Sequence, residues 1–175
     1  MAPVTDRRRL IVMRHAKAEN FAATDHERAL TDRGRADAEA VGARLREEGL
    51  VPDYVVVSSA VRAVQTWEAV AQTAGYVDVP VFFEEAVFNG GPHVVMEAIR
   101  VVPDETETVL FVGHNPAAEY LCHFFDDGEG DPEAVTGLLK GFPPAAVAVL
   151  EMRVPWSELG PETGRVVGYF VGSGD

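Results

Sequence analysis

Two arginines and two histidines in this sequence carry the side chains that phosphoryl transfer requires. Arg14 and His15 directly follow the apolar run LIVM. Arg62 stands shortly after YVVVSS, and His114 follows TVLFVG. An arginine can bind two phosphoryl oxygens, and a neutral imidazole is a competent nucleophile toward phosphorus. These residue types predict transfer of a phosphoryl group to one histidine and hydrolysis of that phosphohistidine by water, with the arginines stabilising the developing charge.

Each of these residues also fits a purely structural interpretation. The Arg14–His15 pair could lie in a solvated turn, and Arg62 could be an ordinary surface residue. In the stretch GHNP, Asn115 could cap a helix that Pro116 begins, with the histidine incidental. The functional interpretation therefore depends on whether the fold brings the four side chains to one place.

Apolar runs alternate with helical patterns along the chain, which predicts an α/β fold. Strands are expected at 9–13, 54–59, 79–83 and 108–113. Helical patterns cover 32–48, 60–75, the stretch between Pro92 and Pro103, 116–125 and 131–141. Two C-terminal strands, 145–154 and 164–172, are expected to form an antiparallel hairpin. Helices between the strands imply a mainly parallel, helix-covered sheet, and its ligand-binding carboxyl edge receives all four side chains.

Length and composition narrow the class of protein. A chain of 175 residues is expected to form one domain over residues 1–175. The formal net charge of −13 argues against binding to nucleic acid or to anionic membranes, although one local phosphate pocket remains compatible with it. The single cysteine, Cys122, excludes an internal disulfide, and no apolar run reaches the length of a membrane span. We therefore expect a cytoplasmic protein.

Four short motifs, in this order, resemble those of a known family. The stretches MRHAKAE, SSAVRAVQT and VGHNP are similar to motifs of the histidine phosphatase superfamily, also called phosphoglycerate-mutase-like. The segment 25–45 resembles the small bacterial phosphohistidine phosphatase branch, whose Asp-x-x-Arg-x-Leu-Thr-x-x-Gly pattern is matched from Asp25 to Gly34. The resemblance covers roughly residues 9 to 121.

The resemblance implies a role for each candidate residue. His15 would be the phosphorylated nucleophile, and Arg14, Arg62 and His114 would complete the phosphate pocket. Arg28 falls where the small branch can add a positive contact to the substrate. The family also implies a three-layer α/β/α fold and no requirement for a metal or another cofactor.

The sequence departs from the family pattern at two places. Ala16 follows the nucleophile where most of the superfamily has glycine, although the small branch often has alanine there. The general acid of many relatives would fall at Glu84 or Glu85, and Glu85 lies better in register, but a solvated acidic loop fits equally well. The lack of a clear general acid favours phosphohistidine, whose nitrogen leaving group can already be protonated, or a substrate with an aryl or acidic leaving group.

The leading interpretation is a metal-independent protein phosphohistidine phosphatase. A phosphatase of small phosphorylated metabolites and a non-catalytic phosphate- or phosphoprotein-binding module remain alternatives, and the oligomeric state stays open. Short strand-to-helix connections argue against a mutase, which needs lid insertions. His26, His93 and His123 show no metal-ligand spacing with each other or with Cys122, so we expect no function for them.

Overall fold

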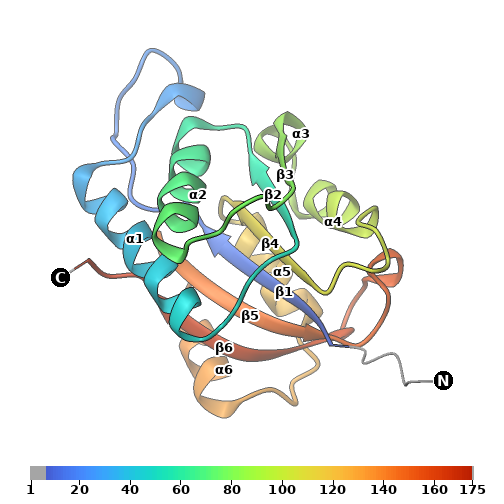
Figure 1. Ribbon diagram of the computed structural model, residues 1–175. Coiled ribbons are helices and arrows are strands. Elements are labelled where there is room, and N and C mark those ends of the chain that lie inside the picture. Colours follow the sequence, from blue (N-terminus) through green and yellow to red (C-terminus); the bar gives the residue numbers. More distant parts are fainter. Residues whose placement is uncertain (1–6, 175) are drawn as a thin grey trace.

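A six-stranded sheet with strand order β3-β2-β4-β1-β5-β6 forms the centre of the protein, whose computed structural model describes residues 7–174 (Figure 1). Neighbouring strands are parallel from β3 to β1, and β5 is antiparallel to both β1 and β6. The strands are β1 (Arg8–Arg14), β2 (Tyr54–Ser58), β3 (Val81–Glu84), β4 (Thr108–Gly113), β5 (Ala146–Met152) and β6 (Gly164–Val171). The mainly parallel sheet with an antiparallel C-terminal pair is confirmed.

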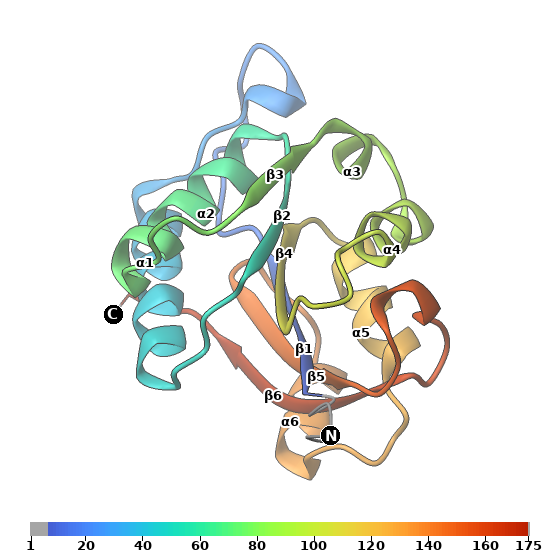
Figure 2. The ribbon, with the colours of Figure 1, turned by 45° about the vertical axis from the view of Figure 1, so that its right-hand side comes forward.

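Helices cover both faces of the sheet, which confirms the three-layer α/β/α architecture (Figure 2). One face packs against α1 (Asp32–Glu47) and α2 (Val61–Ala74). The other packs against α4 (Pro92–Arg100), α5 (Ala117–Phe125) and α6 (Pro132–Leu139). The short helix α3 (Glu85–Asn89) directly follows β3.

The apolar run of β1 explains how the strand can be buried on both faces. Leu10 and Val12 belong to the core beneath α4 and α5, whereas Ile11 and Met13 belong to the core beneath α1 and α2. All four side chains are fully buried. Because successive side chains of a strand point to opposite faces, a central strand needs apolar residues at every position. The polar residues that follow, beginning with Arg14, therefore mark the point where the chain leaves the core.

Three local expectations need correction. The third strand begins at Val81 rather than at residue 79, because Pro80 has no N–H to donate and only its carbonyl pairs, with the amide of Val55. A solvated acidic loop was one of the two expectations for the residues after this strand, but they form the short helix α3. The connection between β1 and α1 covers residues 15–31 and includes the 3-10 helix Asp25–Glu27. It is therefore not one of the short strand-to-helix connections on which the expectation against a mutase rests.

The start of α1 fastens this long connection to the body of the protein. Thr31 caps the helix as expected, because its Oγ1 accepts a hydrogen bond from the amide of Gly34 at 2.9 Å. A Cβ atom at Gly34 would lie only 2.0 Å from the carbonyl oxygen of Lys17. Glycine therefore lets α1 approach the segment that follows His15.

Within residues 7–174, no helix combines the length and apolar character needed to cross a membrane.

Candidate active site

The side chain of His15 is held at the carboxyl ends of β1 and β4. Its backbone amide donates to the carbonyl of Gly113 at 2.9 Å, which ties the two strand ends together. Its Nδ1 lies 2.7 Å from the carbonyl oxygen of Ala16. Because a carbonyl can only accept, Nδ1 carries the hydrogen and Nε2 keeps its lone pair. The residue is 8% exposed, so the geometry presents a nitrogen of a buried histidine that is able to act as a nucleophile.

Ala16 fits the site without needing the conformational freedom of glycine. The residue is fully buried, and it is not among the residues of the described chain with a positive φ angle. Its amide donates to Thr66 Oγ1 at 3.0 Å, and that hydroxyl donates to the carbonyl of Arg62 at 2.7 Å. The alanine therefore takes part in a hydrogen-bond chain that links the segment after β1 to the first turns of α2.

Arg62 is the second residue of α2, and its guanidinium group is almost completely buried. Its two terminal nitrogens donate to Asp25, at 2.8 Å to the backbone carbonyl and at 3.2 Å to Oδ2. Arg14 donates through NH1 to the carbonyl of Phe142 at 3.2 Å. The Nε atoms of both arginines are buried and lack a hydrogen-bond partner within residues 7–174. Buried donors of this kind are costly to leave unpaired, so a bound anion would stabilise them.

His114 follows β4 and lies beside His15. The two ring centroids are 5.2 Å apart, and His114 Nε2 forms a hydrogen bond of 2.7 Å with Ser58 Oγ at the end of β2. Asn115 donates through Nδ2 to the carbonyl of Phe142, and its Oδ1 accepts from the amide of Glu119 in α5. Asn115 therefore contacts the first turn of α5 but does not cap it, because the N-cap is Pro116 and the helix begins at Ala117, one residue later than expected.

The electrostatic environment keeps both histidines neutral. Burial lowers the pKa of His15 from 6.5 to about 4 against the hydrogen bond to Ala16, and the charge of Arg62 lowers it further. Burial, the neighbouring His15 and Arg62 lower the pKa of His114 to about 3. At pH 7 the site therefore combines two uncharged imidazoles with two cationic guanidinium groups. This combination suits attack on phosphorus by a neutral nitrogen.

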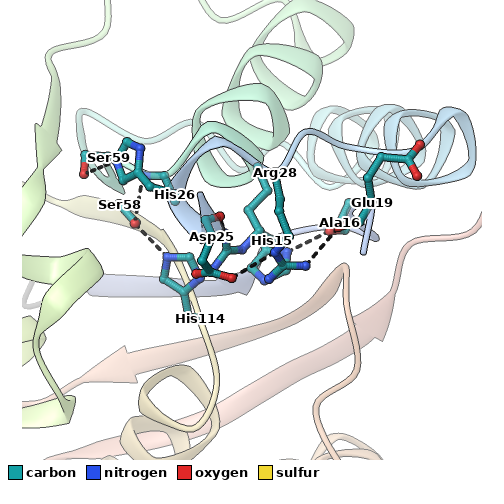
Figure 3. Close-up of polar contacts among 11 residues, drawn as sticks. His15, Ala16, Glu19, Asp25, His26, Arg28, Ser58, Ser59 and His114 are labelled. Carbon is teal, nitrogen blue, oxygen red and sulfur yellow. Dashed lines mark hydrogen bonds and ion pairs between the residues drawn. The ribbon is translucent and has the colours of Figure 1, made fainter. Parts of the chain in front are cut away.

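Arg28 joins the same group of residues through a carboxylate. Its Nε donates to Asp25 Oδ1 at 2.9 Å, and its NH1 donates to the backbone carbonyl of Glu19 at 3.0 Å (Figure 3). Asp25 therefore lies between Arg28 and Arg62. The structure brings together five of the predicted site residues, namely Arg14, His15, Arg28, Arg62 and His114. Glu85 is exposed at the start of α3, and its role as general acid stays a prediction.

Three residues near the pocket were not among the predicted site residues. Asp25 belongs to the sequence pattern that matches the family, but it was not assigned a contact in the site. His26 Nε2 lies 3.0 Å from Ser59 Oγ, so this serine binds a histidine and Ala60 takes the N-cap position of α2. Phe88 packs edge-on against both His26 and His114, with ring centroids 4.8 and 5.7 Å apart. The expectation that His26 has no function is not tested, but its place is beside the pocket.

Comparison with known proteins identifies the family. Residues 10–87 match the model of the histidine phosphatase superfamily (branch 1). An uncharacterized protein of Mycobacterium tuberculosis is 34% identical over 161 residues, which cover 91% of this chain and 99% of that protein. The chain belongs to the histidine phosphatase superfamily.

Two solved structures share the fold along most of their length. A candidate phosphohistidine phosphatase SixA from Nakamurella multipartitia has a TM-score of 0.82 and 29% identity, over 94% of this chain and 96% of that one. A second candidate SixA, from Agrobacterium tumefaciens, has a TM-score of 0.78 and 26% identity, over 94% and 98% of the two chains. The family and these neighbours support a phosphatase activity for this protein.

Proposed function

We propose that this protein is a phosphatase that transfers a phosphoryl group from its substrate to His15 and then to water. The observation that carries the proposal is the hydrogen bond between His15 Nδ1 and the Ala16 carbonyl, which leaves Nε2 unprotonated beside the buried Arg62 and the partly buried Arg14. A pure binding module would not need a nucleophile held in this way. Membership of the superfamily supports the same activity.

The proposed reaction has two displacements at phosphorus. The lone pair of His15 Nε2 attacks the phosphorus atom, and the bond to the leaving group breaks with its electron pair on that group. Water then attacks the phosphohistidine, the bond between phosphorus and Nε2 breaks, and inorganic phosphate forms. Arg14 and Arg62 bind the non-bridging oxygens, and His114 donates a hydrogen bond to them as charge develops.

The substrate that we propose is phosphohistidine in a protein. The nitrogen that leaves from phosphohistidine can already be protonated. Its departure therefore needs less help from a general acid than the departure of the alkoxide from an alkyl phosphate. The exposed position of Glu85 fits a site with little acid assistance. A cavity of about 210 Å³ adjoins the site, and Phe88, Gly91, His114 and Pro116 are among its lining residues. An aromatic wall of this kind suits a flat ring as the leaving group.

As part of this proposal, the protein acts in the cytoplasm. Cys122 is a buried free thiol of α5, and burial raises its pKa far above its ordinary value, which keeps the thiol protonated and unreactive. A lone thiol of this kind suits a reducing compartment. The expected partner is the phosphorylated protein itself.

Hydrolysis of p-nitrophenyl phosphate in the presence of EDTA tests the mechanism. We expect turnover by the intact protein and a loss of about 10³-fold or more in His15→Ala, since the nucleophile is removed. His123→Ala is a matched control, because this histidine is exposed on α5 and should leave the rate unchanged. Activity that survives in His15→Ala, or that requires added metal, would contradict the mechanism. Phosphate binding without turnover of any phosphate compound would indicate a binding module instead.

A comparison of leaving groups tests the substrate. We expect a phosphohistidine peptide to be hydrolysed with a higher kcat/KM than an alkyl sugar phosphate. The Glu85→Gln variant should hydrolyse the phosphohistidine peptide as fast as the intact protein does, because the leaving nitrogen supplies its own proton. Faster turnover of the alkyl phosphate would contradict the proposed substrate and would indicate a phosphatase of small metabolites.

A further inference from the structure

The carboxylate of Asp25 lies between the guanidinium groups of Arg28 and Arg62 at the candidate phosphate pocket. Its Oδ1 accepts a hydrogen bond from Arg28 Nε at 2.9 Å, and its Oδ2 accepts from Arg62 NH2 at 3.2 Å. Its backbone carbonyl accepts a further hydrogen bond from Arg62 NH1 at 2.8 Å. A single residue therefore uses three oxygen atoms to hold two arginines in place.

These contacts determine the direction of the remaining donors of Arg62. A guanidinium group is planar and has five N–H groups. Once both terminal nitrogens are bonded to Asp25, the plane is defined, and the unused donors, including the unpartnered Nε, point in set directions. The side chain of Arg62 is only 6% exposed, whereas that of Asp25 is 62% exposed. Asp25 therefore orients a buried arginine from the solvent side of the pocket.

The charge of Asp25 also changes the balance of the pocket. Although partial burial acts to raise it, the hydrogen bond from Arg28 and the charge of Arg62 hold the pKa of Asp25 below 3.8, so the carboxylate is ionised at neutral pH. Arg14, Arg28 and Arg62 carry three positive charges, and both histidines are neutral. The carboxylate lowers the net positive charge of these residues by one, and Glu119 also faces Arg14, so the attraction for a phosphate dianion is reduced.

We propose that Asp25 is a positioning residue that aligns Arg62 and Arg28 and limits how tightly the pocket retains inorganic phosphate. This inference rests on the proposed phosphatase function, in which phosphate is the product that must leave. A phosphate bound to the unused donors of Arg62 lies near the Asp25 carboxylate, and their negative charges repel each other. The carboxylate therefore favours release of the product, while its hydrogen bonds keep the arginines ready for the next substrate.

Two substitutions separate the positioning role from the charge. Asp25→Asn removes the charge but keeps the size and one side-chain acceptor, whereas Asp25→Ala removes both. Glu27→Gln is the matched control, because Glu27 is an exposed carboxylate in the same 3-10 helix and no role in the site is assigned to it. Because both acidic side chains are largely exposed, all three variants should fold, which the midpoint of urea unfolding checks.

Calorimetric titration with inorganic phosphate measures the charge effect directly. We expect Asp25→Asn to bind phosphate about tenfold more tightly than the intact protein, since one neighbouring negative charge is removed. Glu27→Gln should bind phosphate with unchanged affinity. Equal or weaker phosphate binding by Asp25→Asn would overturn the proposed limit on product retention. This measurement needs no turnover, so it stays informative even if the proposed phosphatase function fails.

Kinetics with p-nitrophenyl phosphate test the positioning effect. We expect Asp25→Ala to have a kcat about tenfold below that of Asp25→Asn, because the alanine cannot orient the guanidinium groups. A lower KM in Asp25→Asn, parallel to its tighter phosphate binding, would complete the expected pattern. An equal kcat in the two Asp25 variants would overturn the positioning role.

Discussion

Moderate acid should destabilise the folded protein through His15. Burial holds the pKa of this residue at about 4, whereas an unburied histidine has a value of 6.5. Between these two values the unfolded chain binds a proton that the folded protein does not. The folded state therefore suffers no penalty from neutral His15 above pH 6.5. As the pH falls from 6.5 toward 4, protonation of this histidine in the unfolded chain lowers the free energy of unfolding. Linkage predicts a loss of about 2 kcal/mol at pH 5 and about 3 kcal/mol at pH 4.

Urea unfolding at pH 7.5 and pH 5 checks this prediction with His15→Asn beside the intact protein. The asparagine has no proton to bind, and its amide can still donate to the carbonyl of Ala16. We expect the intact protein to lose about 2 kcal/mol more than the variant between the two pH values. A His123→Asn control should follow the intact protein, because this histidine is exposed. If His15→Asn and the intact protein lose the same stability, the reasoning about a buried neutral imidazole is wrong.

Three further substitutions test other contacts of the site. Gly34→Ala should lower the free energy of unfolding by about 1 to 3 kcal/mol, because its Cβ would lie 2.0 Å from the carbonyl oxygen of Lys17; thermal unfolding measures the loss. Thr66→Val should cost about 1 to 3 kcal/mol in urea unfolding, since the buried amide of Ala16 loses its acceptor. Arg62→Lys should reduce kcat/KM for p-nitrophenyl phosphate by at least about tenfold, because an ammonium group cannot replace the planar fork, and unchanged kinetics would contradict bidentate binding.

The parallel sheet and the place of the candidate active site could be predicted because local sequence patterns indicate both. The run from Leu10 to Met13 is apolar at every position, as a strand buried on both faces requires. Arg14 ends β1, and His15 and His114 directly follow β1 and β4, which lie side by side in the sheet. The carboxyl edge of a parallel sheet is where such residues meet, so their order in the chain already indicated a common site.

The rest of the pocket depends on contacts that no local pattern reports. The connection between β1 and α1 folds back because the amide of Leu30 donates to Gln65 Oε1 at 2.8 Å and that of Thr31 donates to the Lys17 carbonyl at 3.0 Å. This arrangement carries Asp25 to an arginine 37 positions away in the chain. The short helix α3, which carries Phe88, has too few residues to show a helical period.

The position of β5 next to β1 has a consequence for protein synthesis. The carbonyl of Phe142 accepts hydrogen bonds from both Arg14 and Asn115, and the amide of Ala145 donates to the carbonyl of His15 at 3.1 Å. These partners leave the ribosome long after the strand that begins the sheet. Domains fold as cooperative units, so the pocket stays unfinished in the nascent chain until Phe142 and Ala145 have been made. The candidate nucleophile is therefore made well before the residues that complete its surroundings.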